Sequence, residues 1–239
     1  MRAVLHARWR KEQFDPGWLG PFVNPFFIAR RNLMRAMRDT APRLGGALLD
    51  VGCGTQPYRA LFRADRYVGL DIDNAAVRAR GVADLFYDGG AFPVADAQFD
   101  SILCNQVLEH VFNPDPFVAE IARALRPGGH LLLTVPFVWD EHEQPFDYAR
   151  YSSFGLAALL KRHGFEIIEQ RKLTADSSLF FQLLNAYFYK LVARWPRIAR
   201  LAVVTLLMAP LSLLGLMFGA LLPRSPDLYL DQLVLARRS

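Results

Sequence analysis

The residues ALLDVGCGT, at positions 47–55, form a short apolar run that is followed by two glycines. The run predicts a buried strand over Ala47–Val51, and Gly52 and Gly54 allow a sharp turn and a close approach to a ligand. Similar apolar runs, separated by helical patterns, predict strands at 67–70, 101–104, 131–135, 165–170 and 227–236. Strands that lack alternation and are separated by helices are typical of a parallel sheet covered on both faces. We therefore expect an α/β, doubly wound fold.

Five stretches have the spacing or the terminal signals of helices. The first precedes the sheet and carries four arginines on one side, and Gly-Gly at 45–46 ends its segment. Pro127-Gly128-Gly129 and Gly164 end two others. The predicted helices are Pro25–Asp39, Pro57–Ala64, Pro116–Leu125, Ser153–His163 and Ser177–Arg194.

Charge is distributed unevenly along the 239 residues. The chain has 28 basic and 23 acidic groups, and 52% of its residues are hydrophobic. Residues 1–46 carry a net charge of +6, residues 47–173 carry −5 and residues 174–222 carry +3. A basic and apolar face favours anionic lipid over nucleic acid as a partner. Two cysteines and no signal-peptide apolar region in MRAVLHARWRKEQF lead us to expect a reducing, cytoplasmic location.

The end of the second predicted strand carries a further clue to the ligand. Asp71 lies 17 residues beyond Gly54 and is placed to accept hydrogen bonds from the two hydroxyls of a ribose. Pro57 occupies the place of the third glycine in a dinucleotide fingerprint. Because pyrophosphate needs a close backbone approach there, NAD and FAD are disfavoured, whereas a nucleoside without phosphates remains compatible.

Four segments in this order resemble the class I S-adenosylmethionine-dependent methyltransferases of the type 11 family. They are LLDVGCGT at 48–55, YVGLDI at 67–72, FPVADAQFDSILCNQVLEHV at 92–111 and LRPGGHLLLTVP at 125–136. The resemblance covers about residues 45–173, with a final strand at 228–237. It implies a Rossmann-like, mostly parallel seven-stranded sheet, S-adenosylmethionine as the cofactor and methyl transfer as the reaction.

The same resemblance assigns the cofactor residues by position. The amino-acid end of the cofactor is assigned to Asp50, Gly52, Cys53 and Gly54. The ribose is assigned to Asp71, the adenine to Ile72, Asp88 and Gly89, and the methionine moiety to Asn105 and Gln106. Asp84 is an alternative to Asp88 in the same loop. Glu109 and His110 are expected to position the loop rather than to catalyse.

The polar, aromatic stretch 139–151 follows the fifth predicted strand, where such sheets bind ligands. His142 is a candidate base for an oxygen acceptor, with Glu141 or Glu143 raising its pKa, and Arg150 is a candidate for binding an anionic acceptor. The alternative is a solvated loop that only spaces the following helix. One histidine with scattered acids is a poor zinc site, so no metal is expected.

Residues 201–222 are uncharged and long enough in principle to cross a bilayer. The last strand re-enters the same sheet, so the insert must cross zero or two times. Pro210, Gly215 and Gly219 suggest a bent or re-entrant element, and arginines flank the run on both sides. We therefore interpret 177–222 as a monotopic membrane anchor, with the basic arm on anionic headgroups. A helical subdomain buried in a dimer interface or over the sheet is the alternative.

The predicted organisation is a basic helical arm (1–46), a cofactor-binding core (47–173), an apolar helical insert (174–226) and the final strand (227–239). A membrane seat suggests an amphiphilic, lipid-linked or glycan-linked acceptor at the inner face of the cell membrane. Two alternatives stay open: a methyltransferase of a soluble small molecule whose insert forms a dimer interface, and a non-catalytic cofactor-binding scaffold. A nicotinamide-dependent oxidoreductase is disfavoured by Pro57 and by the lack of a Tyr-x-x-x-Lys pair.

Overall fold

The computed structural model describes residue 9 and residues 11–239. Within these residues the chain forms two compact units. The sheet unit comprises 37–137, 141–171 and 232–239, and the hairpin unit comprises the described residues up to 36 together with 138–140 and 172–231. Contacts therefore group the described part of the basic arm up to residue 36 with the apolar insert, whereas residues 37–46 belong to the sheet unit. The four-part organisation expected from the sequence stays a prediction.

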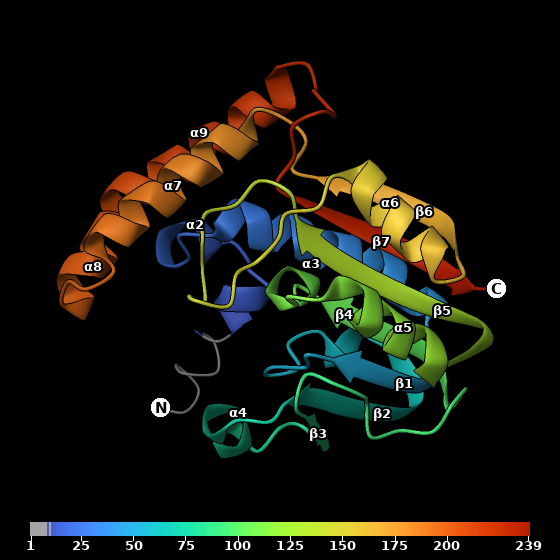
Figure 1. Ribbon diagram of the computed structural model, residues 1–239. Coiled ribbons are helices and arrows are strands. Elements are labelled where there is room, and N and C mark those ends of the chain that lie inside the picture. The colour runs from blue at the N-terminus through green and yellow to red at the C-terminus, as the bar shows by residue number, and fades with distance from the viewer. Residues whose placement is uncertain (1–8, 10) are drawn as a thin grey trace. The chain divides into compact units, whose positions relative to one another are not determined.

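The sheet unit is built on seven strands in the order β3-β2-β1-β4-β5-β7-β6. The pairings from β3 to β5 are parallel, whereas β7 runs opposite to β5 (Figure 1). This arrangement confirms the predicted α/β fold with a mostly parallel seven-stranded sheet. The strands are β1 (Gly45–Val51), β2 (Arg63–Ile72), β3 (Leu85–Tyr87), β4 (Phe99–Asn105), β5 (Leu125–Pro136), β6 (Phe165–Leu173) and β7 (Asp231–Arg238).

The core of this unit lies between the sheet and two amphipathic helices, α5 (Pro114–Ala124) and α6 (Ser153–Arg162). Val118 and Ile121 of α5 and Leu156 and Leu160 of α6 are fully buried in one cluster with the middle strands. Burial on both faces explains why these strands are continuously apolar. Short 3₁₀ turns at Ala41–Arg43 and Leu108–His110 complete the connections.

The predicted helix Pro57–Ala64 is wrong. Only a 3₁₀ turn, Arg59–Leu61, follows the glycine loop, and β2 already begins at Arg63. Gln56 adopts a left-handed conformation with φ of 51°, which does not lead into a helix. A helix, α4 (Ala75–Arg80), and strand β3 lie in the connection for which the sequence predicts only a long loop. β3 has three residues, too few for a periodic pattern.

The hairpin unit contains α2 (Gly20–Val23), α7 (Ser178–Val192), α8 (Arg197–Val203) and α9 (Ala209–Leu221), together with the start of α3 (Phe27–Thr40). A π-helical turn at Val204–Met208 joins α8 to α9, so that Arg197–Leu221 is one helix of 25 residues. This helix and α7 lie side by side as a hairpin (Figure 1). Asn185 Nδ2 donates to Ser212 Oγ at 2.9 Å between them, and both residues are buried.

Pro210, which we expect in a bent or re-entrant element, lies within the continuous helix Arg197–Leu221. The wide turn immediately before Pro210 relieves the clash and the missing N–H that proline causes in a regular α-helix. Gly215 serves close packing instead, since a Cβ there would lie 2.8 Å from Ile28 Cδ1 and 2.9 Å from Phe181 Cβ. Nearby, the rings of Phe181 and Phe218 stack at 5.7 Å.

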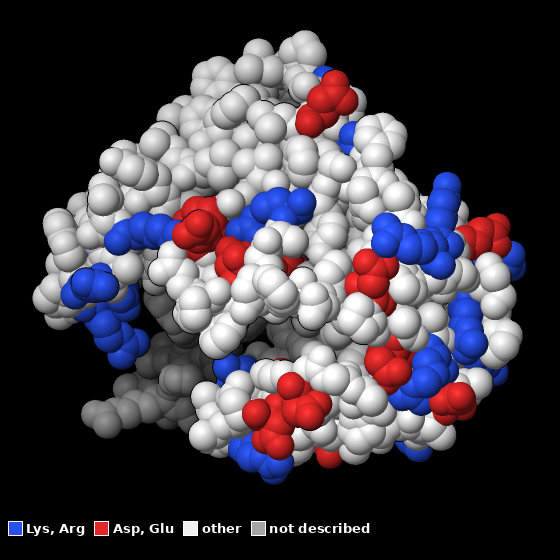
Figure 2. Space-filling model, in the orientation of Figure 1, with Lys and Arg blue, Asp and Glu red and all other residues white. Residues whose placement is uncertain are grey.

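The long helix is apolar and largely uncovered. By length and composition it could cross a membrane, with a mean hydropathy of 2.3 over its most apolar window and only 28% of that window buried. Core helices of soluble proteins also meet these criteria of length and composition, although they are mostly buried. In Figure 2 the surface over α7 and α9 is mostly white, with charged groups gathered toward its ends and margin.

Candidate cofactor and acceptor site

The parallel register brings the carboxyl ends of four strands to one edge of the sheet. Val51 at the end of β1 pairs with Leu70 on one side and with Cys104 on the other. Ile72 at the end of β2 pairs with Tyr87 at the end of β3. The loops that follow these strands therefore converge, as in other open α/β sheets that bind ligands at this edge.

The glycine loop has the tight geometry that its sequence predicts. Gly52 has φ of +68°, and a Cβ there would lie 2.4 Å from Val107 Cγ2, so a side chain is excluded. Gly54 also has positive φ, but nothing lies within 4 Å of its Cβ position. Burial and the nearby acids raise the pKa of Cys53 to about 12. Its thiol is therefore neutral, and Cys53 contributes packing and backbone rather than a nucleophile.

Asp71 holds this loop against the second strand. Its Oδ2 accepts the backbone N–H of Gly54 at 2.9 Å, and its Oδ1 accepts the backbone N–H of Ile72 at 2.8 Å. The carboxylate is nearly buried and fully oriented by the backbone. Because each carboxylate oxygen has a second lone pair, Asp71 can also accept hydrogen bonds from a ribose.

Asp50 lies deeper, at the end of β1. Its Oδ2 accepts a hydrogen bond from the Tyr67 hydroxyl at 2.7 Å. Burial, opposed by this hydrogen bond and reinforced by the charge of Asp71, raises the pKa of Asp50 to about 7. A cationic group beside Asp50 would stabilise its ionised form.

The predicted adenine position has an exposed aliphatic side chain. Ile72 is 37% exposed, and a Cβ on Gly89 would lie 3.9 Å from Ile72 Cδ1, so the two residues border the same space. Asp88 is exposed in this loop and accepts the N–H of Gly90 at 3.0 Å. Asp84, the alternative to Asp88, instead accepts the backbone N–H of Gly69 at 2.7 Å. An open apolar face beside an acid fits an adenine ring and its amino group.

Asn105 and Gln106 are held together at the end of β4 through one partner. Thr134 Oγ1 donates to Asn105 Oδ1 at 2.8 Å, and Gln106 Nε2 donates to Thr134 Oγ1 at 3.3 Å. Gln106 has a left-handed backbone with φ of 56°. Sequence reasoning missed Thr134, whose only signal is that it is the polar residue in the otherwise apolar run 131–135.

His142 and Arg150 both contact Asp147. Asp147 Oδ2 lies 3.2 Å from His142 Nδ1 and accepts the His142 backbone N–H at 2.9 Å. Arg150 donates to the two oxygens of Asp147 at 2.6 and 2.7 Å. This pairing holds the pKa of Asp147 well below its usual range, so Asp147 stays ionised. Asp147 is a partner of His142 that the sequence did not indicate, and an effect of Glu141 or Glu143 on His142 stays a prediction.

The structure adds two residues to His142 from a distant segment. The ring of His110 lies 4.8 Å from that of His142, and His110 Nδ1 lies 2.8 Å from the carbonyl of Phe146. Candidate ligand atoms of Glu109, His110 and His142 all lie within 4.8 Å of one another. The sequence pattern indicates one histidine and no metal, because it does not show that these segments meet. The carbonyl of Glu109 also accepts the N–H groups of Tyr148 and Ala149, which supports a positioning role.

The predicted acceptor stretch 139–151 is divided between the two units. Residues 141–151 belong to the sheet unit, and Trp139 and Asp140 belong to the hairpin unit. There Trp139 packs against Phe26 with ring centroids 5.8 Å apart, and Asp140 forms an ion pair with Lys190 at 2.9 Å.

The seven-stranded sheet is that of a Rossmann-like methyltransferase fold, and comparison with known proteins agrees. Residues 49–133 match the family model described as a methyltransferase domain. An uncharacterized methyltransferase of Mycobacterium ulcerans is 32% identical over 190 residues, covering 74% of this chain and 72% of that protein. The chain belongs to this family of S-adenosylmethionine-dependent methyltransferases.

Other matches are shorter or more distant. A protein of Mycolicibacterium smegmatis named as a probable S-adenosylmethionine-dependent methyltransferase is 36% identical, over 52% of this chain and 53% of its own length. The chain thus spans about half the length of that relative. The crystal structure of the [4+2]-cyclase SpnF superposes with a TM-score of 0.57 at 24% identity, covering 86% of this chain and 80% of that one. That likeness shows the fold alone.

Proposed function

We propose that this protein transfers the methyl group of S-adenosylmethionine to an amphiphilic or lipid-linked acceptor, as a peripheral or monotopic enzyme on the cytoplasmic face of the cell membrane. The observation that carries the membrane part is the 25-residue apolar helix, most of whose apolar window is uncovered. The cofactor part rests on family membership and on the loop that Gly52, Gly54 and Asp71 build.

Different residues of the sheet unit would hold different parts of the cofactor. When bound, S-adenosylmethionine supplies a methyl group on a sulfonium, which is a good leaving group. Asp71 would hold the ribose, Ile72 and Asp88 the adenine, and Asp50 the cationic end of the amino-acid part. Asn105 and Gln106 would orient the methionine moiety. Much of the rate in such a displacement comes from alignment and from the exclusion of water.

An oxygen acceptor also needs a group that takes its proton. The pairing of His142 Nδ1 with the ionised Asp147 makes His142 Nε2 the proton-accepting atom. Arg150 is engaged by both oxygens of Asp147. We therefore give Arg150 the role of keeping Asp147 charged and positioned, with acceptor binding as a secondary role.

The length and connectivity of the hairpin support monotopic binding, in which the hairpin enters one leaflet without crossing the bilayer. α7 has 15 residues, which at 1.5 Å per residue is shorter than the ~30 Å of hydrocarbon that a span requires. The strand that follows the hairpin, β7, pairs in the same sheet as the strands before it. One crossing would leave β7 on the wrong side of the bilayer, so the apolar face would lie within one leaflet.

Flotation with vesicles of phosphatidylglycerol and phosphatidylcholine tests this seat. Ile198 and Leu206 of the hairpin are 86% and 77% exposed, and Phe154 of the sheet unit is 83% exposed. We expect Ile198→Ser with Leu206→Ser to reduce flotation, and Phe154→Ser to leave it unchanged. Wild-type protein that stays unbound, and forms a dimer in sedimentation, would favour the dimer-interface alternative and a soluble acceptor.

A non-catalytic or differently reacting protein is the second candidate, because this fold is shared with a protein named as a cyclase. Cofactor binding alone does not separate these functions. Formation of a methylated product does, and an equal amount of S-adenosylhomocysteine must accompany it.

A further inference from the structure

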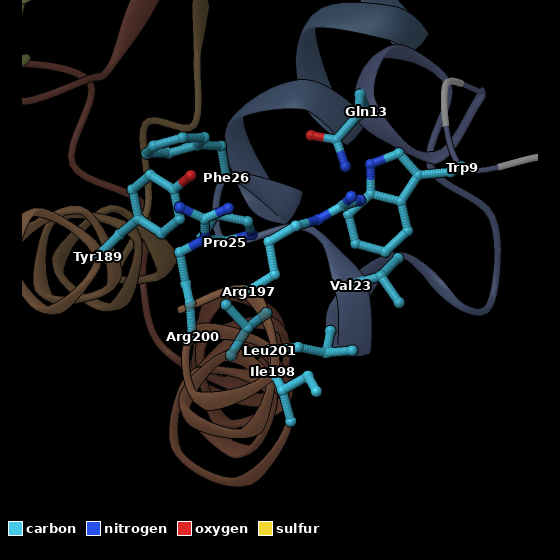
Figure 3. Close-up of a pocket in the computed structure, with 11 residues that line it drawn as sticks. Trp9, Gln13, Val23, Pro25, Phe26, Tyr189, Arg197, Ile198, Arg200 and Leu201 are labelled. Carbon is cyan, nitrogen blue, oxygen red and sulfur yellow. The ribbon is translucent and has the colours of Figure 1, made fainter. Parts of the chain in front are cut away.

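The hairpin unit contains a pocket of about 410 Å³ that the reaction chemistry does not use. Its walls come from the N-terminal segment, from α7 and from the first turns of the long helix. Figure 3 shows Arg197 extending toward Trp9 and Gln13, and Arg200 extending toward Tyr189 and Pro25. Its size lies within the range of small-molecule sites, ~300–1,000 Å³.

The described lining of the pocket carries positive charge and no acidic side chain. Arg197 and Arg200 are the ionisable cations of its lining, and none of the eleven described lining residues is acidic. Arg200 Nη1 donates to the carbonyl of Ala193 at 2.7 Å, which holds one guanidinium in place and leaves its other N–H groups as donors. Two guanidinium groups on one pocket favour a phosphate, which accepts paired hydrogen bonds from their planar forks.

The rest of the lining is apolar and aromatic. Phe26 and Tyr189 pack edge to face with centroids 5.2 Å apart, and Leu201 and Val204 continue the wall along the long helix. Leu201 is 41% exposed, so apolar surface continues beside the arginines on this helix. A ligand that satisfies both parts has an anionic head and an apolar tail.

We propose that this pocket binds the phosphate group of a membrane amphiphile, with its tail along the helix Arg197–Leu221. The inference rests on the membrane seat of the proposed function but requires no methyl transfer. It adds a defined headgroup site to what would otherwise be a general apolar anchor, and it names phosphate as the chemistry of that headgroup.

Calorimetric titration with dodecyl phosphate tests the proposal on the full chain in dodecyl maltoside, without S-adenosylmethionine. Inorganic phosphate is the probe for the head alone, and dodecyl trimethylammonium is the amphiphile of opposite charge. We expect dodecyl phosphate to bind and the other two to bind at least about tenfold more weakly, because charge-assisted hydrogen bonds and the tail both contribute. Equal binding of inorganic phosphate would overturn the proposal in favour of a soluble anion site.

Substitutions separate the pocket from general electrostatic attraction. Arg197→Gln and Arg200→Gln are each expected to weaken binding about tenfold. The controls Arg194→Gln and Arg224→Gln remove the same charge from exposed positions of the same unit outside the lining, and we expect no change beyond twofold. Equal losses in all four variants would contradict the proposal.

A further variant guards against a loss of folding. Arg197→Lys keeps the charge and loses only the planar fork, so it is expected to retain more binding than Arg197→Gln. Binding by Arg197→Lys equal to that of the wild type, at unchanged thermal denaturation, would contradict recognition of phosphate by the planar fork. If dodecyl phosphate binds but no methyl transfer is found, the phosphate site is supported and only the proposed function is contradicted.

Discussion

The backbone N–H of Gly54 donates to Oδ2 of Asp71 at 2.9 Å, and this bond joins the glycine loop of β1 to the end of β2. The acid that is assigned to the ribose therefore also holds the loop that is assigned to the amino-acid end of the cofactor. We therefore predict that binding of the two ends of the cofactor is coupled through this one carboxylate.

Asp71→Asn removes the charge of this carboxylate at nearly constant shape. Hydrogen bonds to charged groups contribute ~1.5–3 kcal/mol, so we expect the affinity for S-adenosylmethionine to fall about tenfold to hundredfold in calorimetry. Asp73→Asn is the control, because Asp73 forms an exposed ion pair with Arg78. An Asp71→Asn variant that binds the cofactor as tightly as the control would show that the ribose assignment is wrong.

The two glycines of the loop differ in a way that urea unfolding can measure. Gly54→Ala changes only the left-handed backbone, at a cost of about 1 kcal/mol. Gly52→Ala adds the clash with Val107 and should cost a further ~1–3 kcal/mol. The double variant Gly52→Ala with Val107→Ala should recover stability relative to Gly52→Ala, after allowance for Val107→Ala alone. No recovery would indicate that steric contact is not the cause.

Asp50 should make cofactor binding depend on pH. Its pKa of about 7 in the protein falls when a cationic group binds beside it, so binding releases a proton below pH 7. The affinity for S-adenosylmethionine should therefore rise with pH between about 5.5 and 7, by at most tenfold per unit, and level off above 7. Asp50→Asn should bind more weakly and lose this slope, and an unchanged slope would contradict the role of Asp50.

His142→Gln should separate catalysis from cofactor binding. A general base contributes ~10²–10⁴-fold, so the rate of transfer to an oxygen acceptor should fall by that factor while cofactor affinity stays constant. Asp147→Asn should produce a smaller loss in the same assay. EDTA should leave the wild-type rate unchanged; a loss that Zn²⁺ or Mn²⁺ restores would instead assign Glu109, His110 and His142 to a metal.

Gly215→Leu should open the hairpin. A Cβ at this position would already contact Ile28 and Phe181, which leaves no room for a larger side chain, so overpacking should cost ~1–3 kcal/mol. Ala220→Leu places the same side chain at an exposed position of the same helix and is the control. Thermal denaturation in detergent measures both, and equal effects would contradict the observed helix packing.

The predictable part of the fold lies where local pattern and tertiary burial agree. Apolar runs at 47–51 and 101–104 are recognisable because both faces of these strands are buried. The residues after Gly54 lead to the wrong prediction of a helix, because Pro57 is favourable at the first position of a helix. β2 begins already at Arg63, so only one 3₁₀ turn fits before it. Pro210 and Gly215 lie within a continuous helix, because a π-helical turn precedes Pro210 and Gly215 allows close packing against Phe181.

Only those residues of the candidate site that lie in short sequence motifs could be predicted. Asp50, Asp71 and the glycines lie in one short motif and its following strand, and they converge as expected from strand order. Thr134, Asp147 and the approach of His110 to His142 depend on contacts between segments about 28 to 36 residues apart or on loop geometry, which no local pattern encodes.

Transfer of a labelled methyl group tests the central claim most directly. Purified protein, S-adenosylmethionine labelled in its methyl group and membranes from the source cell are incubated, and the products are partitioned into organic, aqueous and protein fractions. We predict label in the organic fraction that His142→Gln and Asp71→Asn strongly reduce. Label only in the aqueous or protein fraction would contradict the amphiphilic acceptor, and no label in any fraction, with cofactor binding intact, would contradict the enzyme itself.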